Sequence, residues 1–307
     1  MNDFFSSKVN IIATSLAAIL LVIGLGFTAL GKNVPVKKEE VAQALNKTAT
    51  TSPFSNLRLE AQAALVYDPE TDRIIFDYQG SKPLPLPSLT KVMTALVASE
   101  SLPASAVITI NEQALATYGE SGLYYGEEWL LRDLVDYMLV TSSNDGANAI
   151  AQAVERSQTV PFADRMNQRA KSLGLTNSRF YNESGLDISS DQAGAFGSAL
   201  DVAKLFSYIL KTKPSILEAT SRGIVRSRTL DDISHVGVNT NDLVGSLAGL
   251  RASKTGFTDI ANGNLAVVID RGLRQPVVIV VLGSSQNGRF DDVKKLAEAT
   301  YAWSLNQ

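Results

Sequence analysis

Ser88 and Lys91 stand three positions apart at the start of Leu89–Val97, a stretch that carries no other charge. Residues i and i+3 of a helix share one face, so we expect the Ser88 hydroxyl to meet the Lys91 amine. Desolvation on so apolar a helix would lower the lysine pKa, and a loss of about 3 units from ~10.4 gives a base near neutral pH. The spacing therefore predicts a serine nucleophile activated by lysine. The same two residues also fit a capping serine followed by a solvated lysine.

Two further motifs place polar side chains where they can serve such a nucleophile. Lys254-Thr255-Gly256-Phe257 lies in a run typical of an edge strand, where Lys254 would be a second cation that lowers the pKa of Lys91 and the glycine would let a substrate backbone lie close. Ser142-Ser143-Asn144-Asp145 interrupts two helical patterns and would point a hydroxyl and an amide into a cleft. Taken alone, the first motif also fits a lysine that protects a strand edge, and the second fits a helix N-cap at Asn144 or Asp145.

The composition leaves few residue types other than lysine that could activate a serine. The 307 residues include no cysteine and one histidine, His235, which excludes thiolate nucleophiles, cysteine-ligated metals and multi-histidine metal sites. His235 lies in the polar stretch Asp231–His235, which predicts a loop and a structural or surface role. We expect no metal and no cofactor. The net charge of -3 provides no basic surface, so nucleic acid is not an expected partner.

The rest of the chain supplies elements that can position these motifs. Alternating apolar residues predict a hairpin from 63–67 and 73–78, and strands at 253–257, 263–270 and 277–283. Helical spacing occurs at 89–100, 132–140, 145–156, 161–173, 199–210 and 291–303. Strands at both ends of a helical middle predict an α+β domain over 57–307, in which helices flank one antiparallel sheet and a mainly helical subdomain is inserted.

The first 56 residues differ in composition from this domain. Segment 9–31 is uncharged, apolar and long enough to cross a ~30 Å hydrocarbon core as a transmembrane helix or signal anchor. A cleaved secretory signal would also fit, although its apolar region usually runs only about 7–15 residues. Segment 32–56 is rich in Lys, Thr, Ala and Pro, which is typical of a linker between the membrane and the domain.

The three motifs become specific when their order is considered. Ser-x-x-Lys, Ser-x-Asn and Lys-Thr-Gly follow one another in the order found in β-lactamases and penicillin-binding proteins. From about Ala61 to Tyr301 the chain closely resembles the low-molecular-weight penicillin-binding proteins of the serine D-Ala-D-Ala carboxypeptidase type. The resemblance implies the β-lactamase/penicillin-binding-protein-like (DD-peptidase) fold. Besides the motifs, the segments that carry it are Leu86–Leu96, Phe180–Asp187, Asn239–Asn241, Lys254–Asp259 and Gly288–Asp292.

The resemblance also implies catalytic roles. Ser88 would attack the carbonyl between two D-alanines of a peptidoglycan stem peptide, and Lys91 would take its proton, giving an acyl-enzyme that water hydrolyses. Ser142 would relay a proton to the leaving amine, and Asn144 would orient the substrate and Lys91. Lys254 would raise the local positive potential. β-Lactams are expected to acylate the same serine as covalent inhibitors.

Substrate binding is assigned by the resemblance to the third motif and to one arginine. The backbone N–H groups of Ser88 and Phe257 would hold the oxyanion, and Gly256 would leave room for the substrate backbone. Thr255 and Arg289 would recognise the terminal carboxylate.

Three departures from the family pattern concern the surroundings of the site. Phe196-Gly197-Ser198-Ala199-Leu200-Asp201 stands where the family often has His-x-Ser/Thr-Ala-x-Asp, and Ala261-Asn262-Gly263 replaces its Ala-Gly-aromatic run. Both changes bear on substrate preference. We also expect no β-rich second domain after Gln307, so that the N-terminal span would replace the C-terminal anchor of many relatives.

Three other functions use part of the same residues. A class A β-lactamase needs a Glu-x-x-Leu-Asn loop, which Asn182–Leu186 matches poorly. A D,D-endopeptidase that cuts peptidoglycan crosslinks uses the same catalytic set. A catalytically silent protein that binds peptidoglycan or penicillin would have no use for a desolvated lysine beside a hydroxyl.

The location follows from the expected substrate, because the charges that flank segment 9–31 do not decide its orientation. We expect a single-pass protein of the cell membrane with residues 1–8 in the cytoplasm, and with the linker and catalytic domain on the periplasmic or cell-wall side. A reporter fused after Gln307 tests this orientation, and activity only in the cytoplasm would refute it.

Overall fold

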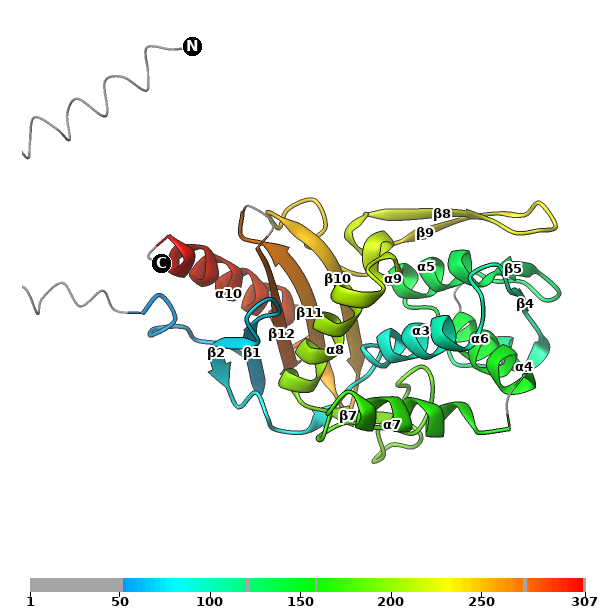
Figure 1. Ribbon diagram of the computed structural model, residues 1–307, viewed down its shortest axis with the longest axis horizontal. Helices are drawn as coiled ribbons and strands as arrows, with labels where there is room; N and C mark the ends of the chain where they lie inside the picture. The colour runs from blue at the N-terminus through cyan, green and yellow to red at the C-terminus, as the bar shows by residue number, and fades with distance from the viewer. Residues whose placement is uncertain (1–51, 120–121, 158, 273–274, 306–307) are drawn as a thin grey trace, which may run out of the picture. The chain divides into compact units, whose positions relative to one another are not determined.

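A five-stranded antiparallel sheet organises the domain in the computed structural model (Figure 1), with the strand order β10-β11-β12-β1-β2. The strands are β1 (Ala63–Asp68), β2 (Arg73–Tyr78), β10 (Leu250–Thr258), β11 (Asn262–Asp270) and β12 (Pro276–Ser284). The hairpin and the three later strands expected from the sequence are confirmed, and β10 lies at an edge of the sheet. Strands β11 and β12 are apolar and buried along nearly their whole length, because both faces of the sheet are covered.

The structure describes residues 52–119, 122–157, 159–272 and 275–305. The expected cytoplasmic segment 1–8, the membrane segment 9–31 and most of the linker 32–56 lie outside these residues. Within them, no helix combines the length and the apolar composition that crossing a bilayer requires. From Ser52 onward the chain forms one compact unit, which contains the candidate catalytic residues.

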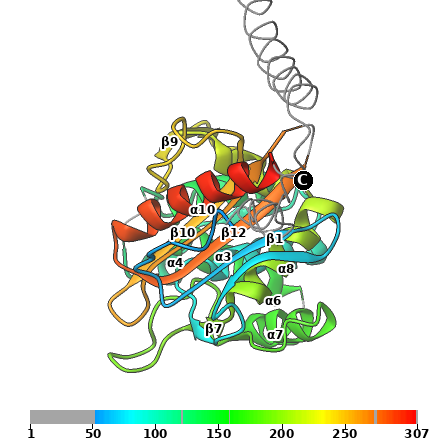
Figure 2. The same cartoon turned by 90° about the vertical axis from the view of Figure 1, so that its left-hand side faces the viewer.

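Helices lie on both faces of the sheet. In Figure 2, α10 (Gly288–Ser304) crosses in front of the strands, with α8 (Ala199–Thr212) behind them. Strand β1 shows how its side chains divide, since alternate residues of a strand point to opposite faces. Ala63 and Leu65 join the core shared with α8, whereas Ala64 and Val66 join the core shared with α10. The α+β architecture expected from the sequence is therefore confirmed.

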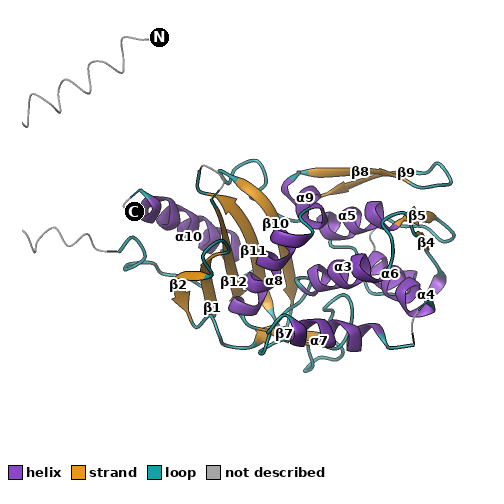
Figure 3. Ribbon diagram, in the orientation of Figure 1, coloured by secondary structure: helices purple, strands orange, loops and turns teal. Residues whose placement is uncertain are grey.

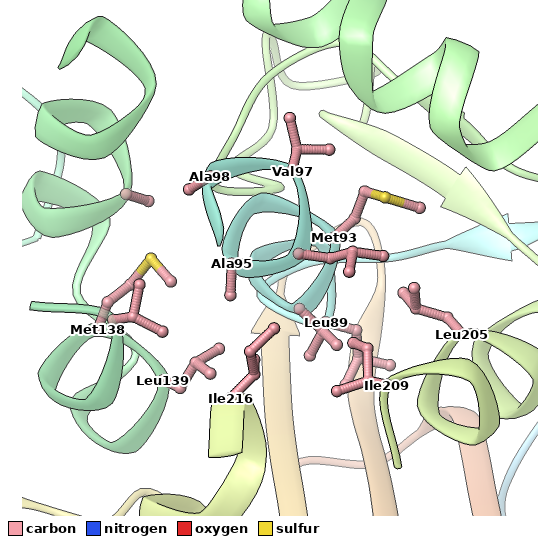
Figure 4. Packing of buried hydrophobic residues seen from close by; sticks show 14 of the residues in the cluster. Leu89, Met93, Ala95, Val97, Ala98, Met138, Leu139, Leu205, Ile209 and Ile216 are labelled. Atoms are coloured by element: carbon pink, nitrogen blue, oxygen red, sulfur yellow. The ribbon is translucent and has the colours of Figure 1, made fainter. Parts of the chain in front are cut away.

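Helix α3 (Thr90–Ser101) lies inside the larger core. Residues 90–98 are all buried, as expected of a helix that is apolar around its whole circumference. The side chains around it in Figure 4 come from α5 (Leu131–Thr141), α8 and α9 (Ser215–Glu218), and include Met138, Leu139, Leu205, Ile209 and Ile216. Lys91 belongs to this enclosed helix and has no exposed surface.

The other end of the domain is mainly helical, as Figure 3 shows. The helices expected there are confirmed with small shifts at their ends; besides α5 they are α6 (Asn144–Arg156) and α7 (Phe162–Ser172), and the short α4 (Glu112–Leu115) and 3₁₀ turn η1 (Ala219–Ser221) add to them. Three small antiparallel sheets are not predicted by the sequence pattern: β3 (Leu84–Pro85) with β7 (Ala195–Gly197) and β6 (Arg179–Phe180), β4 (Val107–Thr109) with β5 (Glu128–Leu130), and β8 (Ile224–Arg228) with β9 (Ser234–Val238).

The prediction that His235 lies in a loop is wrong, because His235 lies on β9 and its side chain is buried. Strands β8 and β9 form a hairpin whose residues alternate between a buried inner face and an exposed outer face. The polar residues that suggested a loop lie at the tip and on the outer face. The expected structural role of His235 agrees with its position: its Nε2 atom lies 2.8 Å from Glu127 Oε1, inside the helical subdomain.

Asp292 fixes the start of α10 to the chain that leads into β1. Its side chain is completely buried, and its oxygens accept hydrogen bonds from the backbone N–H groups of Glu60 at 3.1 Å and Ala61 at 2.9 Å. The hydroxyl of Ser284, at the end of β12, donates a further bond at 2.9 Å. One carboxylate thus joins the start of α10, the end of β12 and the chain that leads into β1.

Candidate active site

Ser88 lies in the turn that leads into α3. Leu89 is the N-cap residue of that helix and makes no side-chain capping bond, so the capping role considered for Ser88 does not hold. Lys91 Nζ lies 2.9 Å from Ser88 Oγ. The contact expected from the i,i+3 spacing is therefore present, and the lysine is enclosed by protein instead of solvated.

The other partners of Lys91 determine which way its lone pair points. Its Nζ donates to Asn144 Oδ1 at 2.7 Å and to the carbonyl oxygen of Ser184 at 3.0 Å. The Asn144 amide cannot be reversed, because its Nδ2 donates to the carbonyl of Tyr118 at 2.7 Å. A neutral amine has two N–H groups and one lone pair. Both N–H groups are taken by groups that can only accept, so the lone pair faces the Ser88 hydroxyl.

Burial lowers the pKa of Lys91 from 10.5 to about 7, against the opposing effect of the Glu183 and Asp145 charges. The enclosed apolar helix penalises the ammonium form, and this is the physical reason that the lone pair is available near neutral pH.

We expect acylation of Ser88 to depend on pH through this group. Below pH 7, Lys91 is protonated and has no lone pair, so the second-order rate constant for acylation by a reactive acyl donor should fall about tenfold per pH unit. Above pH 7 the rate constant should level off. Stopped-flow measurements between pH 5 and 9 check this, and a rate that continues to rise tenfold per unit up to pH 9 would contradict a base with the lowered pKa.

Lys254 lies on β10 and is also buried. Its Nζ donates to Ser142 Oγ at 2.9 Å and to the carbonyl of Thr255 at 2.9 Å. Burial lowers the pKa of Lys254 well below its ordinary value, and the positive charges of Lys91 and Arg289 lower it further. The sequence motifs predict that a second cation lowers the pKa of Lys91. In the structure, repulsion between the cations lowers the pKa of Lys254. Burial is what lowers the pKa of Lys91.

Ser142 and Asn144 reach the site from the junction between two helices. Ser142 ends α5 in the left-handed conformation (φ 63°, ψ 31°), which non-glycine residues adopt rarely. The N-cap of α6 is Ser143, whose Oγ accepts from the Gly146 N–H at 2.8 Å. The other interpretation of this motif, in which Asn144 or Asp145 caps the helix, is wrong. Asn144 is thus left to hold Lys91, while Ser142 turns towards Lys254.

Strand β10 passes directly over the nucleophile at Gly256. A Cβ atom at this position would lie 3.1 Å from the backbone nitrogen of Ser88 and 2.8 Å from Cγ of Pro87. Any side chain would therefore block the Ser88 N–H, and glycine leaves that space for a ligand. Phe257 follows, with its side chain partly exposed at 40%.

Arg289 and Thr255 lie beside the same strand. Arg289 is buried at the start of α10, and its Nη1 donates to the carbonyl of Gly256 at 2.8 Å. Burial lowers its pKa, against the effect of Asp242. Thr255 Oγ1 shares a hydrogen bond of 2.5 Å with Thr240 Oγ1. Cationic side chains therefore gather around β10, an arrangement that attracts a carboxylate.

Beside Asn144 there is a cavity of about 440 Å³, lined by Leu115, Thr117, Gly119, Gly122, Leu123, Tyr124 and Asp145. Its volume is in the range of small-ligand sites.

Within the described ranges, no three His, Asp or Glu side chains are grouped so that they could hold a metal ion.

Three groups that complete the site are not predicted by the sequence. The carbonyl oxygens of Ser184 and Tyr118 set the orientation of Lys91 and Asn144, and the hydroxyl of Thr240 supports Thr255. Ser184 and Thr240 lie in segments that carry the family resemblance, although their residue types suggest no role. A carbonyl belongs to every residue, so only the folded chain reveals which one is used.

Comparisons with known proteins agree with this geometry. The family model described as D-alanyl-D-alanine carboxypeptidase matches residues 46–286. The chain is 28% identical over 255 residues to D-alanyl-D-alanine carboxypeptidase DacF of Bacillus subtilis. The aligned region covers 81% of this chain and 64% of DacF, so the chain spans less than two thirds of the length of that relative. It is 29% identical over 261 residues to a D-alanyl-D-alanine endopeptidase of Pseudomonas aeruginosa, covering 82% and 80%. Penicillin-binding protein D2 of Listeria monocytogenes, solved in its ampicillin-bound form, superposes with a TM-score of 0.69 at 32% identity, covering 80% and 98%.

Proposed function

The chain belongs to the peptidase S11 family of serine-type D-alanyl-D-alanine carboxypeptidases, and from this membership we propose that it removes the terminal D-alanine from peptidoglycan stem peptides. The observation that supports the proposal most directly is the environment of Lys91 Nζ. Two acceptors hold its N–H groups, and its remaining side faces the Ser88 hydroxyl at 2.9 Å. This arrangement activates a serine for acyl transfer without a histidine.

The reaction takes place in two steps. Ser88 Oγ attacks the carbonyl carbon of the penultimate D-alanine, and its proton passes to Lys91 Nζ as the C–O bond forms. The C–N bond then breaks and the leaving amine needs a proton. In this proposal Ser142 supplies it; its Oγ accepts a hydrogen bond from Lys254, which leaves its own O–H for donation. Water reverses these transfers and releases the shortened peptide, so that one water is consumed for each D-alanine freed.

The charges around β10 support a substrate with a free carboxylate. Lys254 and Arg289 are both buried next to this strand, and a buried cation is stabilised by an anion brought close to it. A peptide that ends in D-Ala-D-Ala brings its terminal carboxylate one residue beyond the scissile bond. The proposed carboxypeptidase thus binds its substrate with cations that repel one another when the substrate carboxylate is absent.

Covalent labelling by a fluorescent penicillin tests the nucleophile. We expect the full-length chain to be labelled and Ser88→Ala to lose labelling completely, because the substitution removes the oxygen that contacts the Lys91 base. Ser143→Ala is a matched control, since this nearby serine is used as a helix cap; it should still be labelled. Label on the Ser88→Ala protein would show that another residue is the nucleophile.

The endopeptidase relative, at an identity similar to that of the carboxypeptidase, makes crosslink cleavage the second candidate. Incubation with a pentapeptide ending in D-Ala-D-Ala and, separately, with a crosslinked peptide dimer distinguishes the two. Release of D-alanine from the pentapeptide supports the proposal, and cleavage of the dimer alone supports the endopeptidase. A labelled chain that cuts neither would be a penicillin-binding protein without hydrolytic activity.

A further inference from the structure

The hairpin β8–β9 lies on the end of α5 that carries Ser142. His235 of β9 anchors it: its ring centroid lies 4.8 Å from that of Trp129 and 5.8 Å from that of Tyr137, and Nε2 lies 2.8 Å from Glu127 Oε1. Glu127 also accepts from Trp129 Nε1 at 3.1 Å. The inner face of β9 is thus fixed to the helical subdomain by an aromatic cluster with one buried polar pair.

Two residues further along, Gly237 brings the backbone of β9 against the last turn of α5. A Cβ atom here would lie 2.3 Å from Thr141 Cγ2 and 3.0 Å from Tyr137 Cε2. Thr141 cannot swing away freely, because its Oγ1 donates to the carbonyl of Tyr137 at 2.7 Å. Thr141 immediately precedes Ser142 in the chain. Strand β9 therefore contacts the residue whose backbone determines the position of Ser142.

The chain then passes between the two halves of the site. The backbone N–H of Thr240 donates to the carbonyl of Val140 at 3.2 Å, and its Oγ1 shares the 2.5 Å hydrogen bond with Thr255 of β10. Segment 237–240 therefore contacts α5 just before Ser142 on one side, and β10 just after Lys254 on the other.

We propose that segment 237–240 is a positioning element that sets the distance between Ser142 and Lys254, with Gly237 as its critical residue. The proposal rests on the function proposed above, in which Ser142 returns the proton to the leaving amine. Ser142 is the single left-handed residue between two helices, so the contacts of its neighbours determine its place. A shift of about 1 Å would break its 2.9 Å contact with Lys254, and misplacements of that size cost roughly 10²-fold in rate.

Gly237→Ala tests the proposal in the full-length chain. The added methyl group should push Thr141 and slow acylation by penicillin by about 10-fold to 100-fold. Gly223→Ala is the matched control at the base of the same hairpin, where the nearest atom to a Cβ is 4.0 Å away, and its rate should stay within about twofold of wild type. Circular dichroism and melting temperature establish that each variant is folded.

A compensating substitution separates positioning from a general loss of stability. Thr141→Ser removes the Cγ2 that a Cβ at position 237 would strike but keeps the hydroxyl that bonds the Tyr137 carbonyl. Added to Gly237→Ala, it should restore at least half of the lost rate on a logarithmic scale. A folded Gly237→Ala protein with the wild-type rate would overturn the proposal, and so would a slow one that Thr141→Ser does not restore.

Thr240 provides a second measurement if Gly237→Ala does not fold. Thr240→Val removes the hydroxyl that bonds Thr255 and should slow acylation about tenfold, whereas Thr240→Ser keeps it and should not. Equal rates for both would contradict the proposal.

A crystal structure of Gly237→Ala gives a readout that does not depend on activity: the Ser142 Oγ to Lys254 Nζ distance should exceed about 3.5 Å, the limit of a hydrogen bond. If wild type is not acylated at all, the proposed function fails, while this distance still decides the positioning role.

Discussion

Replacement of Lys91 by methionine is expected to slow acylation of Ser88 by about 10²–10⁴-fold while making the folded protein more stable at neutral pH. The rate falls because no other described group lies with a lone pair towards the Ser88 hydroxyl, and a positioned general base contributes about 10²–10⁴-fold. Methionine has a similar length without the amine, so it fills the space in the apolar core.

The gain in stability follows from the pKa of Lys91. A shift from 10.5 to about 7 corresponds to about 5 kcal/mol between the two protonation states. The carbonyl acceptors of Asn144 and Ser184 lose their partner in the variant, at about 1–2 kcal/mol each, which leaves a net gain of about 1–3 kcal/mol.

The gain should shrink as pH rises. Between pH 7 and 10 the unfolded chain holds a proton on Lys91 that the folded chain has released, so wild-type stability increases with pH in this range. Urea unfolding at pH 7 and 9.5, together with penicillin kinetics, measures both effects. Lys82→Met, at an exposed lysine, is the control and should change neither. A folded Lys91→Met protein that loses less than tenfold in rate would exclude Lys91 as the base.

Asp292→Ala is expected to lower the free energy of unfolding by about 3–5 kcal/mol, a large part of the ~5–15 kcal/mol typical of a domain. The substitution leaves the buried N–H groups of Glu60 and Ala61 and the hydroxyl of Ser284 without their acceptor. Charged acceptors make the stronger hydrogen bonds, and a buried unpaired donor is costly.

The adjacent Asp291 provides a matched control on the same helix. Its side chain is 65% exposed and lies 3.6 Å from Lys294, so Asp291→Ala should change stability by less than about 0.5 kcal/mol. Urea denaturation of both variants gives the comparison directly. Similar losses in the two proteins would show that charge at the helix start matters, and that the buried hydrogen bonds do not.

The elements that position the nucleophile could be predicted because their signals are local. The i,i+3 spacing of Ser88 and Lys91, the apolar circumference of α3 and the alternation in β10 to β12 are each contained in short runs of neighbouring residues. The antiparallel sheet with an inserted helical subdomain follows from the order of such segments.

The groups that finish the site could not be predicted, because their contacts join distant segments. The carbonyl of Ser184 meets Lys91, and the backbone of Gly237 meets Thr141, only after the chain has folded. The short strands β8 and β9 give a weak pattern because their inner face is made of Val, His and Gly instead of a continuous apolar row. His235 therefore resembles a loop residue in the sequence, although its ring is packed among aromatic side chains.

The strand order also has a consequence for how the protein acquires its activity during folding. Strand β1 pairs with both β2 and β12, and β10 joins the sheet only through β11 and β12. The pairing of β1 with β12 forms slowly, because these strands are distant in sequence. The entropy of closing so long a loop must be overcome before their contacts form. Ser88, Lys91 and Asn144 all precede β10 in the chain, so their helices can assemble while Gly256 and Lys254 are still unplaced. A partly folded chain that lacked β10 would hold its nucleophile and base without the strand that presents a substrate, so we expect acyl transfer to require that the last strands have joined the sheet.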